Sequence, residues 1–312
     1  MKKKISVVTP LFNEQDNVTE LCDRISKVMK SLPYDYEHLC IDNCSSDRTV
    51  SILRERTFND PKLRVIVNAR NFGYIRSSFH ALMQASGDAA VLIAADLQDP
   101  PEIIAEFVTK WEIGFKTVMA VKPVSEESAV MFAARKLYYK IIGRISEVPL
   151  VENATGSGLF DRAVLEQLRQ FNDPYPYFRG LVCEVGYPIA TVPFNQPRRL
   201  RGVTSQNFYS LYDMAMLGIT KHSKVPLRLM TLAGFILAGI NILVATGYLI
   251  AKLVFWDAFE LGMAPVLIGL LLFSAIQMIF LGLLGEYIGS IQTQVRNLPL
   301  VVEEERINFE QN

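Results

Sequence analysis

The sequence predicts an α/β fold with a doubly wound sheet, followed by interfacial amphipathic helices and a transmembrane helical hairpin. Two observations carry this prediction. From Ile5 to about Gly114, short β-branched segments alternate with segments of helical periodicity, which is typical of such sheets. Further on, 23 residues from Leu229 to Ala251 and 25 residues from Leu261 to Gly285 carry no charge. At about 1.5 Å per residue, each stretch can cross a hydrocarbon core of roughly 30 Å.

Each expected strand is a short apolar or β-branched run, and capping or stop signals accompany the expected helices. The expected strands are Ile5–Thr9, Glu37–Ile41, Leu63–Asn68 and Ala89–Ala95. The expected helices are Asn17–Leu32, Asp47 to about Thr57, Ile75–Ala85 and Pro100 to about Gly114. Pro10 is expected to end the first strand, and Ser46 or Asp47 to cap the second helix. The wholly apolar run Ala89–Ala95 is typical of the centre of a parallel sheet.

Composition argues against an ordinary cytosolic protein. The 312 residues carry no net charge, and a mean hydropathy of +0.20 is high for a chain with 21% charged residues. Residues 122–228 hold 14 basic against 9 acidic side chains. This excess suits a surface that faces anionic lipid headgroups or a phosphorylated ligand, and an ordinary solvated surface accounts for it equally well.

Two amphipathic segments lie between the expected sheet and the hairpin. Residues 130–146 combine aromatic and aliphatic side chains with basic ones, and residues 207–224 run directly into the first span. Such segments suit the membrane interface, although each can also pack on its own domain. The expected division is a soluble domain over 1–204, a juxtamembrane helix over 205–228, two transmembrane helices over 229–290 and a tail over 291–312.

Charge around the spans predicts the topology. Lys221, Lys224 and Arg228 precede the first span, and Arg296 follows the second. The loop Lys252–Glu260 between the spans carries two acidic residues and one lysine. By the positive-inside rule, both termini are expected in the cytoplasm and this loop on the far side.

The cysteines show no sign of a metal site in the sequence. They form no CxxC pair and, with the three histidines, no zinc-ligand spacing. They are expected to be small apolar packing residues in a reducing, cytoplasmic compartment. The four are Cys22, Cys40, Cys44 and Cys183.

Three polar motifs follow the expected strands, where ligands bind in a doubly wound sheet. They are VVTPLFNEQDNV (7–18), IDNCSSDRT (41–49) and AADLQDPPE (94–102). In this order, and followed by two spans, they resemble the polyprenyl-phosphate glycosyltransferases of family 2, with the A-type glycosyltransferase fold. This group includes bactoprenol-phosphate glucosyltransferases and dolichol-phosphate mannose synthases. The resemblance covers about residues 1–300.

The resemblance implies a divalent-metal site, since a leaving diphosphate needs its charge neutralised. Asp96 and Gln98 match the family residues that hold Mg²⁺ or Mn²⁺ with the diphosphate. A helix cap is the alternative role for a carboxylate in this turn, and Asp99 fits that role better.

The resemblance also assigns the nucleotide site. Asp42 matches the family residue that accepts hydrogen bonds from the base or ribose, although a purely turn-forming role is the alternative. Pro10, Phe12 and Glu14 belong to the segment that walls the nucleotide pocket, and Arg70 matches a segment near the nucleotide. Asn71 belongs to the same segment, and Arg76 is a further candidate for a phosphate contact.

Three departures from the family pattern put a protein base and the sugar identity in doubt. The acidic triplet Asp-x-Asp is Ala94-Ala95-Asp96 here, so its first carboxylate is missing. The segment ATGSGLFDR (154–162) lacks the Asp and Arg of the usual Thr-Gly-Asp-Phe-Arg. Many members carry the motif Arg-x-x-Gly-x-Thr-Lys, and the matching segment of this chain, which begins at Arg199, has Ser205 in place of the lysine.

A phosphate acceptor lessens the need for a base. A phosphate monoester has a second pKa of about 6, so it is already a dianion near neutral pH. Such a nucleophile needs positioning and charge screening, which Arg and Lys supply. The candidates are Lys122, Arg135, Arg199 and Arg201, and each can instead be a solvated or lipid-facing cation. Arg199 and Arg201, with Asp96, form the expected catalytic set.

The sequence thus predicts an inverting glycosyltransferase. It would move a hexose from a nucleotide sugar, most simply a UDP-sugar, to undecaprenyl phosphate at the cytoplasmic face of a bacterial inner membrane. The expected partners are the donor, the lipid acceptor and the membrane, with no nucleic acid. A catalytically lapsed scaffold paralogue is the rival, motivated by Ala94 and Ser205. Small residues in the spans, such as Gly239 and Gly285, allow packing within the hairpin or in a homo-oligomer.

Overall fold

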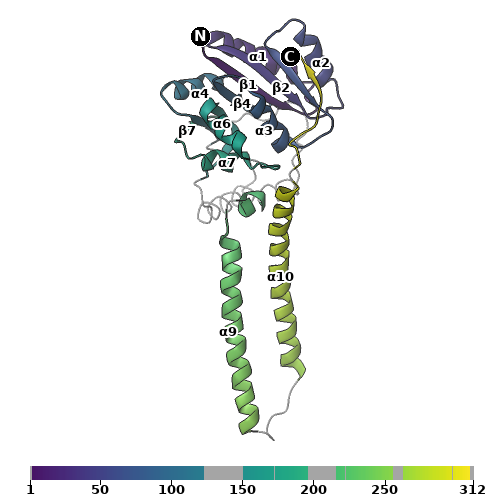
Figure 1. The fold of residues 1–312 in the computed structure, drawn as a ribbon, viewed down its shortest axis with the longest axis vertical. Helices are drawn as coiled ribbons and strands as arrows, with labels where there is room; N and C mark the ends of the chain where they lie inside the picture. The colour runs from purple at the N-terminus through teal and green to yellow at the C-terminus, as the bar shows by residue number, and fades with distance from the viewer. Residues whose placement is uncertain are drawn as a thin grey trace.

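A computed structural model of the chain describes a layered α/β domain and two long helices that extend from it (Figure 1). The described residues are 2–122, 150–171, 173–195, 216–221, 223–255, 263–296 and 298–309. The basic segment 130–146, most of the segment 207–224 and most of the loop between the spans lie outside these residues.

The sheet of the described chain has eight strands in the order β7-β5-β6-β4-β1-β2-β3-β8. The strands are β1 (Lys4–Leu11), β2 (Asp35–Asp42), β3 (Leu63–Asn68), β4 (Ala89–Leu92), β5 (Thr117–Val121), β6 (Ala154–Asp161), β7 (Ile189–Pro193) and β8 (Glu303–Ile307). Strand β1 pairs in parallel with β2 and β4, and β2 pairs in parallel with β3. Strands β6 and β8 run against their neighbours. The apolar strand β4 is therefore central, but one of its two neighbours is antiparallel.

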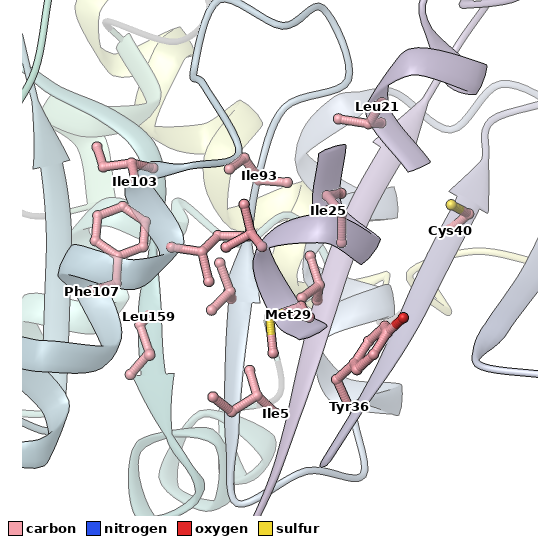
Figure 2. Packing of buried hydrophobic residues seen from close by; sticks show 14 of the residues in the cluster. Ile5, Leu21, Ile25, Met29, Tyr36, Cys40, Ile93, Ile103, Phe107 and Leu159 are labelled. Atoms are coloured by element: carbon pink, nitrogen blue, oxygen red, sulfur yellow. The ribbon is translucent and has the colours of Figure 1, made fainter. Parts of the chain in front are cut away.

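Helices cover both faces of the sheet, which makes the domain a three-layer α/β/α structure. On one face lie α1 (Val18–Ser31), α2 (Thr49–Thr57) and α4 (Ile103–Glu112). On the other face lie α3 (Tyr74–Gln84), α6 (Arg162–Gln170) and α7 (Phe178–Glu184). Figure 2 shows the first of these layers, where Leu21, Ile25 and Met29 of α1 project toward the sheet. The doubly wound architecture expected from the sequence is confirmed.

Most expected elements are present, and the differences lie at their ends. Strand β3 has the expected bounds, while β1 and β2 are longer and β4 shorter than expected. Helix α2 begins one residue after Arg48, so Ser46 and Asp47 were wrong as its cap position. Asp47 nevertheless acts at this end, because its Oδ1 accepts hydrogen bonds from the backbone N–H and hydroxyl of Thr49.

Pro10 does not end β1, which continues to Leu11. The reason lies in the pairing. The carbonyl of Val8 accepts from the N–H of Ile93, on the β4 side, and the last β1–β4 pair is Val8 with Leu92. Two residues on, Pro10 faces the same side, beyond the end of the β4 pairing. Its missing N–H therefore interrupts no ladder bond, as for a proline on an edge strand.

Two helices leave the domain and are long and apolar enough to cross a membrane. They are α9 (Val225–Val254) and α10 (Met263–Val295). Their apolar windows, Val225–Ala251 and Leu272–Val295, have mean hydropathies of 2.1 and 1.5 and are 0% and 6% buried. Because almost none of this apolar surface is covered by the rest of the chain, the helices need an apolar environment. This supports membrane association of the protein.

The C-terminal tail returns to the domain and joins its sheet. Strand β8 pairs antiparallel with β3, from Val65–Ile307 to Asn68–Glu303, and Figure 1 shows this segment lying along the domain. Arg54 donates two hydrogen bonds of 2.6 Å to Glu305, and His80 contacts Glu303 at 2.6 Å. The end of α10 is thus attached to the domain. Before α9, Lys221 donates hydrogen bonds to Asp173 of the same domain, so both ends of the helical pair are attached to it.

Burial of one side chain in the tail gives a test of this docking. Val301 is 7% exposed and its neighbour Val302 is 52% exposed. We expect Val301→Asp to lower the unfolding free energy of the domain by about 2–4 kcal/mol, because a carboxylate replaces a buried apolar group. Val302→Asp should change it by less than about 0.5 kcal/mol. Thermal unfolding of the detergent-purified full chain, followed by circular dichroism, measures both; equal effects would contradict the docking.

Near the amino end of β2, an interior strand of the sheet, Glu37 is a buried carboxylate that accepts hydrogen bonds from several donors. It is 3% exposed and accepts hydrogen bonds from the Ser6 hydroxyl, the Ser86 N–H, Lys4 and Arg64. Burial alone would raise the pKa of Glu37, but these hydrogen bonds outweigh it and lower the pKa to about 2.

This lowered pKa predicts acid sensitivity. A carboxyl with a lower pKa in the folded state stabilises the fold above its unfolded pKa, and this contribution disappears as the pH falls toward the folded value. For Glu37 the window runs from about pH 4.5 down to about pH 2, and the contribution is about 3 kcal/mol. Melting temperatures of the wild type and Glu37→Gln across this range test it. The wild type should lose its advantage over the variant on acidification; a constant difference would contradict the prediction.

Candidate active site

Polar loops gather at the carboxyl edge of the sheet, where β1, β2, β3, β4 and β5 all end. The full parallel register of β1 with β2 places Leu11 opposite Asp42, so the loops after these strands begin side by side. Strand β6 runs the other way and begins at this edge, where Ala154 pairs with Val121. The three motifs found in the sequence therefore meet at one edge, as expected for a ligand site in an α/β sheet.

The loop after β1 is fastened to the loop after β2. The backbone N–H of Asn13 donates to the Ser45 hydroxyl at 2.8 Å, and Asn13 Oδ1 accepts from the N–H of Ser46 at 2.9 Å. Asn13 has a φ of 55°, in the left-handed region that asparagine tolerates better than most residues. The N–H of Glu14 donates to Thr49 at 2.9 Å, which extends the connection to the start of α2.

Asp42 ends β2 and is completely buried. Its two carboxylate oxygens accept hydrogen bonds from the N–H of Ser45 at 2.8 Å and its hydroxyl at 2.5 Å. Burial raises the pKa of Asp42, although the Ser45 hydrogen bonds act against this. The turn-forming role is thus present in the structure, and it fixes the orientation of the carboxylate at the carboxyl edge of the sheet.

Asn43 connects the loop after β2 to the end of β3, to the loop that follows it and to α3, and it was missed by sequence reasoning. It is 5% exposed, and its Oδ1 accepts from the Phe72 N–H at 2.9 Å, the Ser77 hydroxyl at 2.9 Å and Asn68 Nδ2 at 3.1 Å. Its Nδ2 donates to Asn71 Oδ1 at 2.7 Å. The only signal in the sequence was a second polar residue directly after a buried strand.

Two arginines face one aromatic ring beside this network. The guanidinium of Arg70 lies 3.9 Å from the ring centroid of Phe72, and that of Arg76 lies 5.4 Å from it. Arg76 also donates to the carbonyl of Pro299 in the tail at 2.5 Å. Burial and the charge of Arg70 lower the pKa of Arg76. Arg70 itself is exposed, so this edge presents positive charge to solvent.

The turn after β4 offers hard oxygen donors to a cation. Asp96 and Gln98 are both half-buried, and Leu97 between them has a φ of 59°. This conformation folds the turn so that Asp96 Oδ1 accepts from the Gln98 N–H at 3.1 Å. A carboxylate and an amide oxygen suit Mg²⁺ or Mn²⁺, so the residues present fit such an ion.

Asp99 is not the helix cap that the sequence favoured. The cap position of α4 is Glu102, without a side-chain capping bond. Asp99 is instead 3% exposed, and its Oδ2 accepts from the Ser157 hydroxyl at 2.5 Å. The cause is the antiparallel strand β6, which the sequence reading did not place here and which brings Ser157 against this turn.

Arg179 is a further residue of this edge that the sequence reading did not single out. It lies near the start of α7, and its Nη2 donates to the carbonyl of Thr155 at 2.9 Å. The neighbouring Gly156 has a φ of 103°, and a Cβ there would lie 3.7 Å from the guanidinium. A glycine is thus used where the backbone turns left-handed beside a cation.

The remaining expected site residues have different placements. Pro10 is a buried strand residue, not part of the loop, and Phe12 is 39% exposed at the edge. Glu14 is 8% exposed and accepts from Asn17 at 2.7 Å. Lys122 directly follows β5, where its N–H donates to the carbonyl of Asn153. Arg135, Arg199 and Arg201 lie outside the described residues.

A cavity of about 410 Å³ lies elsewhere. It is lined by residues of α3, of α6 and the loop after it, and of the tail, with none of the expected site residues. Among its lining residues are Phe79, Met83, Leu168, Arg169 and Leu300. The candidate active site is therefore identified from the polar residues at the strand ends and not from this cavity.

Comparison with known proteins agrees with this fold. Residues 6–169 match the model of glycosyl transferase family 2. The chain belongs to this family and is a glycosyltransferase with a GT-A-like α/β domain and two long apolar C-terminal helices.

Several relatives match over almost their full length. The SfII prophage-derived bactoprenol glucosyl transferase of Shigella flexneri is 32% identical, over 95% of this chain and 96% of its own. An uncharacterized glycosyltransferase of Bacillus subtilis is also 32% identical, over 98% of this chain and 94% of its own. A mannosyltransferase of Pyrobaculum calidifontis, solved with GDP-Man and Mn²⁺, aligns with a TM-score of 0.47 at 18% identity, covering 95% and 88% of the two chains.

The Asn43 network can be tested by removing its centre. Asn43→Ala leaves several buried polar groups without their partner, and we expect a loss of about 2 kcal/mol or more in the free energy of unfolding. Asn59 is the control, because it is also an asparagine but is exposed. Asn59→Ala should lower the free energy of unfolding by less than about 0.5 kcal/mol. The melting temperatures of the two variants decide it; similar values would show that the network does not hold the loops.

Proposed function

We propose that this glycosyltransferase moves a hexose from a nucleotide sugar, most simply a UDP-sugar, to a polyprenyl phosphate, with inversion at the anomeric carbon. The observation that carries the proposal is the combination, in one chain, of a polar carboxyl edge suited to a nucleotide diphosphate with two uncovered apolar helices. Relatives such as the bactoprenol glucosyl transferase of Shigella flexneri suggest the acceptor class.

Different described residues would bind different parts of the nucleotide-sugar donor. Asp42, Phe12 and the loop held by Glu14 lie where the base and ribose would bind. Arg70 and Arg76 place positive charge beside them, which suits phosphate oxygens. Asp96 and Gln98 would hold Mg²⁺ or Mn²⁺, which would supply charge neutralisation to the leaving nucleoside diphosphate.

The acceptor brings its own negative charge. The phosphate oxygen attacks the anomeric carbon, a bond forms between them, and the bond to the nucleoside diphosphate breaks on the opposite face. No proton has to be removed from a phosphate dianion, so a protein base is not required. Lys122 at the end of β5, with Arg135, Arg199 and Arg201, would hold this phosphate.

The helices explain how such an acceptor is reached. A polyprenyl chain stays in the hydrocarbon, so its phosphate lies at the membrane surface. Because α9 and α10 are both attached to the domain, the enzyme would work at that surface. We place the domain over 1–204 and both termini in the cytoplasm of a bacterium, with the juxtamembrane segment 205–228 at the interface, from the basic residues that flank the spans.

Asp96→Asn tests the metal role. It keeps the shape of the side chain but removes the charge, and we expect transfer to fall by about a hundredfold or more. Asp88→Asn is the matched control, because Asp88 lies at the opposite end of the same strand and accepts from the Lys4 N–H. The measurement is transfer of radiolabelled sugar to undecaprenyl phosphate in membranes that contain each variant.

The outcomes separate this proposal from its rival. Near-normal transfer by Asp96→Asn would overturn the metal assignment. A wild type that transfers nothing from UDP-, GDP- or TDP-sugars would favour the scaffold paralogue, which the missing carboxylate at Ala94 motivates.

A further inference from the structure

Three soft donor side chains meet in the core beneath the carboxyl edge. They are Cys22 of α1 and His38 and Cys40 of β2, and their ligand atoms all lie within 4.8 Å of one another. The residues are 4%, 3% and 0% exposed, respectively. No other group of three or more potential metal ligands this close is found among the described residues.

The fold places these residues together although they are separate in the sequence. Alternation along β2 puts His38, Cys40 and Asp42 on the same face of the sheet. Cys22 lies on the buried side of α1, next to Leu21, in the layer that packs on this face. Figure 2 shows Cys40 on its strand within the same core cluster as Leu21 and Ile25.

The distances match those of a metal site. Cys40 Sγ and His38 Nε2 are 3.5 Å apart. In a tetrahedral zinc site, Zn–S bonds of about 2.3 Å and Zn–N bonds of about 2.0–2.1 Å put sulfur and nitrogen ligands about 3.5 Å apart. Thr9 Oγ1 lies 3.1 Å from the same His38 nitrogen, so an oxygen is also at hand for a fourth position.

Simple packing explains the two cysteines but not the whole group. Buried thiols are common as small apolar side chains. An imidazole costs free energy in a core unless its nitrogens have partners, and this one directs Nε2 at a thiol and a hydroxyl. Two thiolates would also cancel the charge of a divalent cation, so an occupied site would add no net charge to the core.

We propose that Cys22, His38 and Cys40 form a site for Zn²⁺ or a cation of similar softness. Binding releases the two thiol protons to solvent and forms two Zn–S bonds and one Zn–N bond, with no change of oxidation state. The site differs in ligand class from the turn of Asp96 and Gln98, whose oxygens suit Mg²⁺ or Mn²⁺. Because Cys40 lies two residues before Asp42, an ion here would also fix the end of β2.

Cobalt substitution is the sharpest test. Full-length protein, purified in detergent under reducing conditions and freed of metal, is titrated with Co²⁺ and then with Zn²⁺. We expect a thiolate-to-cobalt absorption band that saturates at one equivalent and is abolished by zinc. Cys22→Ser, Cys40→Ser and His38→Gln should each weaken binding by more than about tenfold. Cys183→Ser should not, since Cys183 is also buried but lies outside the group.

Other outcomes would overturn the site. Absence of a thiolate band in the wild type would show that the cysteines only pack. Equal loss in Cys183→Ser would show that the band does not come from this group. Both results are read from proteins that retain the three residues, so misfolding of the cysteine variants cannot hide them. Asp96→Asn should leave the band unchanged, because the active-site turn contributes no thiolate; loss of the band in this variant would show that it does not report the core group.

Discussion

The parallel pairing of β1 with β2 is the constraint on which the site depends. These strands are matched over eight residues each, from Lys4–Asp35 to Leu11–Asp42, so they end together. Their loops then lie close enough for Asn13, Glu14, Ser45 and Thr49 to exchange hydrogen bonds. A slip in this register would separate those groups and would turn Asp42 to the other face of the sheet. The position of the candidate nucleotide carboxylate is therefore set by backbone pairing, and its orientation by Ser45.

The tail strand extends the same dependence to the membrane helices. Without β8, strand β3 would be an open edge with unpaired backbone groups. The pairing of β8 with β3 closes that edge and attaches the end of α10 to the domain. The chain enters the helical pair at the start of α9. Arg76 lies at this junction, because it contacts both Pro299 of the tail and the Phe72 ring beside the candidate nucleotide loops. A displacement of the tail would therefore move the Arg76 side chain and so change the candidate site.

The sequence was sufficient for features that depend on local periodicity and motif order. The alternation of strands and helices, the bounds of β3, the two apolar helices and the family were all predictable in this way. Features that depend on long-range pairing were not. Nothing local indicates that Glu303–Ile307 forms an edge strand beside β3, or that Ala154–Asp161 runs antiparallel between β4 and β5. The Cys22, His38 and Cys40 group was missed for the same reason, since its spacing has meaning only once α1 covers β2.

Asp99 illustrates how such a pairing changes the interpretation of chemistry. Read locally, an aspartate before two prolines and a helix is a cap, and this left Asp96 with the metal. The antiparallel strand instead brings Ser157 to Asp99 and buries both, so a second carboxylate lies in the turn whose first carboxylate is absent at Ala94. A buried carboxylate keeps its charge only with hydrogen-bond donors or a cation nearby. A second carboxylate is thus held in this turn, a few residues after Ala94, by the strand that the sequence did not reveal.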